Sequence, residues 1–338
     1  MLVLGIETTC DETACAVVRD GREILSNVVS SQIDLHKQFG GVFPELACRR
    51  HMDIFIPVIQ KAIQEAEVVP EELDLISVAK GPGLIGPLLI GLNAAKSLAF
   101  AWDKPFIGVN HVEAHLYASM MSNSEAPFPS LGVVVSGGHT FLVRMSDLGS
   151  YELIGTTVDD AIGEAFDKVA GMLGLPYPGG PAIEALARKG DPLKYSFKPG
   201  RVKNRPWDFS FSGLKTNVLY TVKGQNGNKN DPIMLSEEQK ADIAAAFQET
   251  ALKEIVDKSL KAADAFHCRS IFLGGGVSNN QRLRQLFVER GPSIQIYWPS
   301  AGLSLDNAAM IAGLGYHQFL KQGNSDPFDL EPMTRIPL

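Results

Sequence analysis

A strand, a short polar turn and a second strand occur twice in this chain, and this repeat restricts the fold more than any other feature. The apolar stretches that flank each turn have the length and the branched residues of buried strands. The first copy spans residues 2–7, 8–13 and 14–18, and the second spans residues 131–135, 136–139 and 140–145. Because helical patterns alternate with further strands, we expect two α/β domains, each presenting one polar turn to a shared cleft.

Hydrophobic periodicity and turn residues place the other elements along the chain. Strands are predicted at residues 24–30, 74–79, 106–109, 270–273 and 294–298. Helices are predicted at residues 44–67, 112–121, 159–173, 236–265 (as one or two helices), 281–289 and 305–320, with a further helix that follows the turn at 81–86 and reaches about Trp102. A linker is expected at Pro127-Phe128-Pro129.

The bulk composition limits the class of protein. A chain of 338 residues with 45% hydrophobic side chains is long enough for two domains with cores of their own, and its net charge of −7 makes it as a whole a poor binder of nucleic acid. The four cysteines form no C-x-x-C pair, which argues against a disulfide framework. The longest uncharged apolar stretch, residues 81–95, is interrupted by turns and is too short to span a membrane. We therefore expect a cytoplasmic protein, without a signal peptide or a membrane partner.

His111 and His115 lie one turn apart on a predicted helix and therefore on the same face of it. Two imidazoles at this spacing are able to hold one metal ion, but such a pair equally serves as helix surface or core. Asp306, at a predicted helix start, either caps that helix or supplies the missing carboxylate. Two histidines and a carboxylate favour a transition metal such as iron or zinc. His139 either approaches the metal or packs beside its turn.

Two glycine-rich stretches follow predicted strands. In Ser136-Gly137-Gly138 the glycines allow backbone N–H groups to converge on a phosphate, although a simple β-turn explains the tripeptide equally well. Gly274-Gly275-Gly276 follows a strand and opens a helix, a context that suits a nucleotide or an anion. Neither stretch has the spacing of a Rossmann dinucleotide site or of a P-loop.

A basic segment contrasts with the acidic remainder of the chain. Residues 188–229 contain ten basic side chains against two acidic ones, a local net charge of +8, and the basic residues are interleaved with Tyr195, Phe197, Trp207, Phe209 and Phe211. This pattern favours contact with nucleic acid. A solvated basic loop whose aromatic rings serve the core is an equally valid interpretation.

Taken together, the ordered motifs resemble the bacterial TsaD (also Gcp) family of tRNA N6-adenosine threonylcarbamoyltransferases over nearly the whole chain. The motifs are GIETTCDET (5–13), GGVFPELA (40–47), NHVEAH (110–115), VSGGHT (135–140), DDAIGEAFDK (159–168), YPGGP (177–181), FSFSGLKT (209–216), GGVS (275–278) and DNAAMI (306–311). The departures are small: Thr9 and Cys48 stand where serine is usual, Pro87 lies in the glycine-rich turn, and Glu184 stands where some members have aspartate. None of these changes removes a group that the chemistry needs.

The resemblance implies the actin-like, sugar-kinase and heat-shock-protein (ASKHA) fold, with two α/β domains around a central nucleotide and metal cleft. We expect an N-terminal domain at residues 1–129, with a C-terminal helix at 307–325 packing back on it. The second domain is expected at residues 130–306, with the basic insertion at 188–230. The implied reaction transfers threonylcarbamoyl from threonylcarbamoyl-AMP to N6 of adenosine 37, in tRNAs that read codons beginning with adenine. AMP is released.

The resemblance also assigns site residues. The metal ligands fall on His111, His115 and Asp306 and hold one divalent metal per subunit, iron(II) as the first expectation and zinc as the second. Substrate-binding positions fall on Val134, Val135, Ser136, Gly137, Gly138, Asp167, Gly180 and Asn280. Glu12, near the first turn, is a candidate catalytic residue for proton handling or for positioning tRNA, and its simpler role is the polarity of the turn. The implied partners are tRNA, a TsaB-like non-catalytic paralogue and a TsaE-like ATPase.

Three rival functions remain to be weighed. A metallopeptidase would use the histidine pair, but Glu113 does not follow the first histidine directly, as H-E-x-x-H requires. A sugar-kinase-like phosphotransferase would share the cleft but leaves the two histidines without a purpose. A structural or regulatory partner would tolerate alanine at all three metal ligands.

Overall fold

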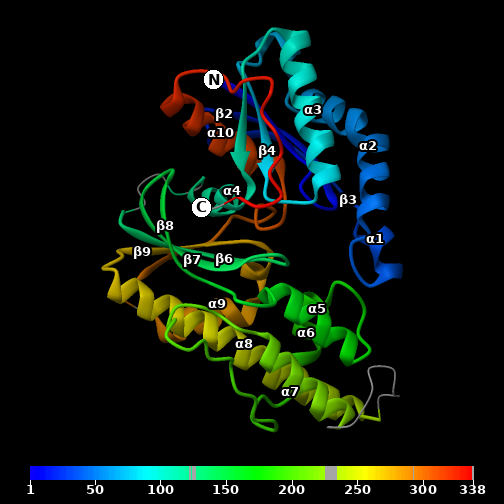
Figure 1. The fold of residues 1–338 in the computed structure, drawn as a ribbon, viewed down its shortest axis with the longest axis vertical. Coiled ribbons are helices and arrows are strands. Elements are labelled where there is room, and N and C mark those ends of the chain that lie inside the picture. Colours follow the sequence, from blue (N-terminus) through cyan, green and yellow to red (C-terminus); the bar gives the residue numbers. More distant parts are fainter. Residues whose placement is uncertain (122, 124–126, 225–233, 292, 337–338) are drawn as a thin grey trace. The chain divides into compact units, whose positions relative to one another are not determined.

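The chain forms two compact units, which are described separately. The computed structural model describes all residues except 122, 124–126, 225–233, 292 and 337–338. The first unit comprises Met1–Glu125 and Pro299–Leu338, and the second comprises Ala126–Trp298 (Figure 1).

The first unit is built on a mixed sheet of five strands in the order β3-β2-β1-β4-β5. β1 pairs antiparallel with β2, which pairs antiparallel with β3, whereas β1, β4 and β5 run parallel. The strands are β1 (Leu2–Glu7), β2 (Glu12–Arg19), β3 (Glu23–Ser31), β4 (Leu75–Gly81) and β5 (Phe106–Asn110). The tight turn between β1 and β2 therefore carries the polar residues that follow Glu7.

Helices cover this sheet on both faces. On one face, α2 (Pro44–Glu65) and α3 (Ile85–Trp102) bury Phe55 and Leu92 against Leu4 and Ile6 of β1. On the other face, α10 (Ala308–Gln322) packs on β1, β2 and β4 and also contacts α4 (His111–Met120). Strand residues alternate in direction, so Gly5 faces α10, where a Cβ atom would lie 2.2 Å from the carbonyl oxygen of Ala308. The short helices are α1 (Ile33–His36), η1 (Lys37–Phe39) and η2 (Pro70–Glu72).

Helix α3 is long and apolar enough to cross a membrane, judged by length and composition, and it is the one such helix among the residues that the structure describes. Core helices of soluble proteins meet the same criteria. Leu92, Ala95 and Ala99 of α3 are buried beneath α2 and against the sheet. The apolar character of α3 therefore has a packing explanation on one side of the helix.

The second unit repeats the strand arrangement of the first. Its sheet order is β10-β9-β6-β7-β8, with β6, β7 and β8 antiparallel and β6, β9 and β10 parallel. The strands are β6 (Ser130–Val135), β7 (Thr140–Asp147), β8 (Ser150–Thr156), β9 (Ser270–Gly274) and β10 (Gln295–Tyr297). β6 and β7 thus correspond to β1 and β2, which confirms the repeated strand–turn–strand design and the α/β class.

The helices of the second unit pack around a core that includes Phe166, Phe209, Phe247 and Phe287. They are α5 (Ile162–Met172), α6 (Gly179–Ala187), α7 (Ser212–Lys223), α8 (Glu237–Ala265) and α9 (Gln281–Arg290), with the short η3 (Gly276–Asn279). The pattern at 236–265 forms one continuous helix of 29 residues, started by a capping box at Ser236 and Gln239. Strand β8 and helices α6 and α7 were not predicted from periodicity.

Helix α5 begins three residues later than the pattern predicts, because its two preceding aspartates have other partners. Asp159 Oδ1 accepts hydrogen bonds from the backbone N–H groups of Phe211 (2.8 Å) and Ser212 (3.2 Å), at the start of α7. Asp160 forms ion pairs with Lys168 and Lys215. Both carboxylates fix the chain ahead of α5, so the first residue free to continue a helix is Ile162.

Candidate functional site

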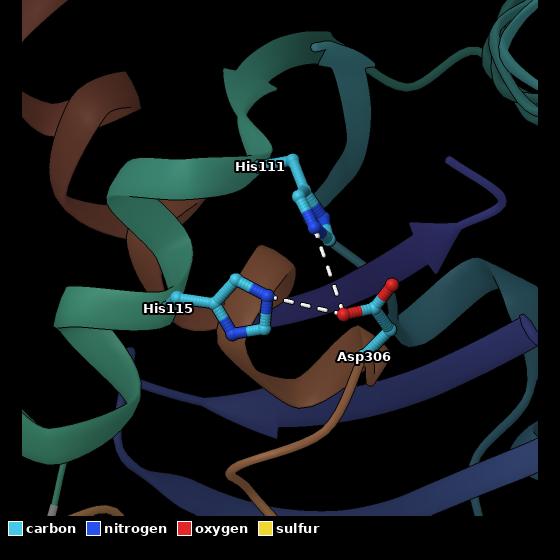
Figure 2. Close-up of side chains that lie close together, drawn as sticks. All are labelled: His111, His115 and Asp306. Carbon is cyan, nitrogen blue, oxygen red and sulfur yellow. Dashed lines mark ion pairs between the residues drawn. The ribbon is translucent and has the colours of Figure 1, made fainter. Parts of the chain in front are cut away.

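The histidine pair lies on a short buried helix that begins directly after a strand. Asn110 ends β5 and caps α4, since its side-chain oxygen accepts hydrogen bonds from the N–H groups of Val112 (2.9 Å) and Glu113 (3.4 Å). His111 is therefore the first residue of α4, and His115 follows one turn later on the same face (Figure 2). Their ring centroids are 4.7 Å apart. The predicted helical spacing is confirmed.

Asp306 does not cap the helix that follows it. That role belongs to Asn307, whose side-chain oxygen accepts a hydrogen bond from the N–H group of Met310 at 3.1 Å. The Asp306 carboxylate instead points to the histidines, with Oδ1 3.0 Å from His115 Nε2 and 3.6 Å from His111 Nε2 (Figure 2). The helix α10 consequently begins at Ala308, later than predicted. Of the two interpretations of Asp306, the structure contradicts the helix cap.

The donor set fits a divalent metal ion. One ligand atom from each of His111, His115 and Asp306 lies within 4.8 Å of the other two. Ligands bound to one metal ion at about 2.0–2.2 Å stand roughly 3 Å from each other, so only a small adjustment is needed. Both imidazoles are buried, whereas Asp306 is partly accessible. Two nitrogens and one carboxylate oxygen, with accessibility on the aspartate side, suit a metal site that keeps positions for a substrate.

Glu7, at the end of β1, supports the first histidine. Its Oε2 atom lies 2.8 Å from His111 Nδ1, and its Oε1 atom accepts a hydrogen bond from the N–H group of Thr9. Burial disfavours the charged imidazolium, yet the nearby charges of Glu7 and Asp306 raise the pKa of His111 to about 9. The metal-facing Nε2 atom is therefore strongly basic, and a metal ion competes with a proton for its lone pair.

Glu12, the candidate catalytic residue, opens β2 in the same unit. Its Oε1 atom accepts a hydrogen bond from the Ser31 hydroxyl at 2.8 Å. Burial, together with the negative charges of Asp306 and Asp11, raises the pKa of Glu12 to about 9. These effects favour the protonated form of the carboxyl group, and a cation bound by Asp306 would act in the opposite direction.

The Ser136-Gly137-Gly138 turn is an exposed hairpin turn between β6 and β7. Val134 and Val135 are buried at the end of β6, while Gly137 and Gly138 are exposed. The Ser136 N–H group donates to the carbonyl of His139 (2.8 Å), and the Ser136 hydroxyl oxygen accepts from the N–H group of His139 (3.1 Å). These two hydrogen bonds close the turn and leave the glycine backbone accessible, as an anion-binding turn requires.

Asp167 and Gly180 come together at the start of α6. The Asp167 side chain accepts a hydrogen bond from the N–H group of Gly179 at 2.7 Å, which ties α5 to the first turn of α6. Burial raises the pKa of Asp167, and the N–H groups of Gly179 and Gly180 offset part of this increase. A Cβ atom on Gly179 would lie 2.6 Å from the Asp167 Cα, so only glycine permits this approach.

Asn280 caps α9, and both the oxygen and the nitrogen of its side-chain amide form hydrogen bonds. Its oxygen accepts a hydrogen bond from the N–H group of Leu283 (3.1 Å), and its nitrogen donates to Gln248 of α8 (2.9 Å). The preceding Gly275 has φ +88° and lies against Val135 and Ser136, so the two glycine-rich stretches of the second unit are neighbours. The sequence had separated them by more than a hundred residues.

Two further residues noted in the sequence, His139 and Glu184, have partners within the second unit. Within this unit, His139 packs edge-on against Phe141. Glu184 accepts a hydrogen bond from the N–H group of Gln281 at 3.0 Å and pairs with Arg188. Sequence reasoning missed Glu7, although a carboxylate at the end of an apolar buried strand was the available signal.

Known proteins of one family match this chain over most or all of its length. The family model described as "TsaD: tRNA N6-adenosine threonylcarbamoyltransferase" matches residues 23–313. A protein of Protochlamydia amoebophila named tRNA N6-adenosine threonylcarbamoyltransferase is 63% identical, across 100% of this chain and 98% of that protein.

Solved structures similar to this chain show the fold. HypF of T. kodakarensis matches with a TM-score of 0.62 and 16% identity, covering 95% of this chain and 48% of that one. The ROK hexokinase of Thermus thermophilus matches with a TM-score of 0.52 and 15% identity, covering 96% of this chain and 99% of that one. At these identities the likeness concerns the fold alone, and it confirms the predicted ASKHA-type architecture.

Proposed function

The chain belongs to the TsaD family of tRNA N6-adenosine threonylcarbamoyltransferases, and from this premise we propose how its residues carry out the transfer. The family membership makes it a transferase that forms threonylcarbamoyladenosine in tRNA. We propose threonylcarbamoyl-AMP as the donor and adenosine 37 of tRNAs reading codons beginning with adenine as the acceptor. The cluster of His111, His115 and Asp306 is the observation that carries the proposal, because it offers a metal site beside the first polar turn.

The proposed reaction is an acyl transfer. The N6 amine of the adenosine attacks the carbamoyl carbonyl carbon, a new C–N bond forms, and the bond between that carbon and the phosphate oxygen of AMP breaks. AMP takes the bonding electron pair, and the amine loses one proton to a base. The nucleophile belongs to the tRNA, so the enzyme's task is to orient the donor and to stabilise the developing negative charge.

In the first unit, His111, His115 and Asp306 would hold one divalent metal, for which we propose iron(II) first and zinc second. Such a metal would supply Lewis acidity that polarises the bound donor. Glu7 holds His111 in the orientation that presents Nε2. Glu12, whose pKa is raised by burial and by the charges of Asp306 and Asp11, would handle a proton in the transfer or position the tRNA.

In the second unit, the exposed Gly137 and Gly138 amides would bind the charged part of the donor. Val134, Val135 and Ser136 shape this turn. Asp167, Gly180 and Asn280 would orient the ribose and the base. Asp167 and Asn280 are held in place by hydrogen bonds from backbone N–H groups in the first turns of α6 and α9. Pre-formed groups of this kind need little rearrangement when the donor binds.

We further propose that a TsaB-like paralogue binds the α2–α3 face of the first unit and that a TsaE-like ATPase assists the complex. This face carries exposed apolar side chains, among them Met52 (69% exposed), Ile56 (57%) and Ile85 (50%). A groove of about 400 Å³ runs along it between Ile56 and Trp102. Exposed apolar area of this kind is typical of a protein interface.

A reconstituted reaction tests the function. The chain is mixed with threonylcarbamoyl-AMP, unmodified tRNA and the helper proteins, and the nucleosides are analysed by mass spectrometry. We expect threonylcarbamoyladenosine and a matching amount of AMP, both lost with His115→Ala. Absence of the modified nucleoside from the wild-type reaction would refute the proposal. The related transferases do not favour the metallopeptidase alternative, which a peptide-cleavage assay on metal-loaded protein checks directly.

A further inference from the structure

The connection between α6 and α7 is unusually long for a segment without regular structure. Residues 188–211, hereafter the basic loop, are all described and contain no helix or strand. Connections of this length inside a compact unit are uncommon, and ordered ones generally carry a function. The family's site residues do not fall on this loop, so its function has to be inferred from its own chemistry.

The basic loop is fixed to the second unit at several points. The Asp191 N–H group donates to Asp242 of α8 at 2.7 Å, and a Cβ atom on Gly190 would lie 2.1 Å from the carbonyl oxygen of Ala241. Near its other end, Phe209 N–H donates to the carbonyl of Thr156 on β8 at 3.0 Å. The loop therefore presents its side chains from a defined backbone.

The aromatic residues of this loop face inward. Phe209 is completely buried, and Tyr195, Phe197 and Trp207 pack against the hydrophobic core of the second unit. Trp207 also contacts Phe266 at the end of α8, with ring centroids 5.8 Å apart. These rings anchor the loop, so they do not provide a stacking platform for bases.

The basic residues of the same loop are exposed, and most of them form no ion pair with described residues. Arg188 pairs with Glu184 and Arg205 pairs with Asp208. Five further cations are exposed, and none forms an ion pair with any residue that the structure describes: Lys189, Lys194, Lys198, Arg201 and Lys203. Seven basic and two acidic residues give the loop a net charge of +5, so the rest of the chain carries −12.

We propose that the basic loop is a contact surface for the phosphate backbone of the tRNA substrate. The inference rests on the transferase function stated above and adds the surface that grips the acceptor. An acidic chain repels a polyanion, and a local group of cations that form no ion pair with the described residues supplies an attraction for it. Since the aromatic rings are turned inward, recognition here follows phosphate positions and is independent of base sequence.

The test neutralises three of the five cations at once. Lys198→Gln, Arg201→Gln and Lys203→Gln are combined in one variant, and the matched control combines Arg22→Gln, Lys261→Gln and Arg269→Gln. The control residues are also exposed and also form no ion pair with described residues. Each variant removes three positive charges, so both change the net charge equally. Thermal unfolding of both variants confirms that they fold.

Steady-state kinetics in the reconstituted reaction, with the helper proteins present, give the expected result. The KM for tRNA rises at least fivefold in the loop variant, whereas kcat and the KM for threonylcarbamoyl-AMP stay unchanged. The dependence of log (kcat/KM) for tRNA on log [NaCl] becomes shallower by about 2–3, since each lost phosphate contact removes roughly 0.7–0.9 from the slope. The control variant retains the wild-type slope.

Two results overturn the inference. One is a loop variant whose KM for tRNA and salt slope match those of the control. The other is an unchanged KM for tRNA together with loss of a co-purifying helper protein, which would make the loop a protein interface. If wild-type chain forms no threonylcarbamoyladenosine, the proposed function fails instead. In that case filter binding of labelled tRNA by the same complexes still tests whether the basic loop contacts tRNA. The comparison is between the affinities and the salt slopes of the two variants.

Discussion

The Nδ1 atom of His111 lies 2.8 Å from the Oε2 atom of Glu7, a carboxylate with no exposed side-chain surface. A carboxylate accepts only, so Nδ1 must carry the proton and Nε2 is the nitrogen left for a metal. This pair connects the end of β1 to the start of α4. The carboxylate–histidine relationship therefore determines both the direction and the tautomer of one proposed metal ligand.

Glu7→Gln should weaken metal binding about 10–100-fold, the range for loss of a group that orients a ligand. A glutamine amide has one acceptor atom, so it cannot serve both His111 Nδ1–H and the Thr9 N–H group. Isothermal titration with Fe²⁺ or Zn²⁺ measures the affinity. Glu113→Gln is the matched control, because Glu113 lies on the same helix and bonds to Gln318. Equal affinities in the two variants would show that Glu7 has no such role.

Asp306→Asn should abolish stabilisation by added metal as well as product formation. A metal at about 100 times its Kd stabilises the folded chain by roughly 2.7 kcal/mol, so the thermal midpoint should rise in the wild type and stay constant in the variant. His317→Ala serves as the control, since His317 is a half-buried histidine of α10 that bonds to Tyr117. A variant that still gains thermal stability from metal would contradict the assigned ligand set.

Two glycines of α5 should respond oppositely to alanine. A Cβ atom on Gly163 would lie 2.7 Å from the carbonyl oxygen of Ser136 and 2.8 Å from the Gly137 Cα, so Gly163→Ala must displace the glycine-rich turn. We expect a loss of about 1–3 kcal/mol in stability and a raised KM for the donor. A Cβ atom on Gly171 would meet no described atom within 4 Å, and Gly171→Ala should gain up to about 1 kcal/mol. Denaturant unfolding and donor titration measure both effects.

Acid stability should depend on the pair of Glu249 and Arg282, which joins α8 to α9. Two hydrogen bonds of 2.7 and 2.9 Å from the guanidinium lower the pKa of Glu249 below its usual 4.5, despite burial. The unfolded chain has the higher pKa, so the stabilisation is present above about pH 4.5 and disappears as the pH falls through the folded value. Glu249→Gln should cost about 1 kcal/mol at pH 7 and much less near pH 3.

The pH dependence of thermal unfolding measures this difference. Glu289→Gln removes a more exposed carboxylate from the same arginine and should have less effect at either pH. A constant difference between wild type and Glu249→Gln from pH 3 to pH 7 would show that the ion pair is not its source.

Ile56→Asp should weaken binding of the TsaB-like paralogue, because a carboxylate in an apolar interface loses its hydration. Ile56 is an exposed residue of α2 beside the groove, so the substitution should leave the fold intact. Val288→Asp, at an exposed position of α9, is the control. Co-purification of the paralogue with each variant measures this binding. Equal recovery with both variants would show that the paralogue does not bind the α2–α3 face.

Much of the fold could be predicted because it depends on local sequence patterns. The apolar strands around the two polar turns and the helices at 44–67 and 236–265 follow from periodicity, which depends on near neighbours alone. The start of α4 at His111 is likewise local, since Asn110 caps it. Helices α6 and α7 escaped prediction because α6 opens with Gly-Gly-Pro and the start of α7 is held by Asp159 from a distant segment.

The sequence by itself determined the α/β class, the repeated strand–turn–strand design and the spacing of His111 and His115. The local pattern left two roles open for Asp306, and the tertiary structure decided against the helix cap. Aspartate and asparagine are both good helix caps and stand side by side at 306 and 307, so no local pattern distinguishes them. Packing of α10 against α4 and β1 gives the cap to Asn307 and turns Asp306 to the histidines. The same long-range packing brought Glu7 to His111, because a contact between distant segments depends on how the whole sheet is covered.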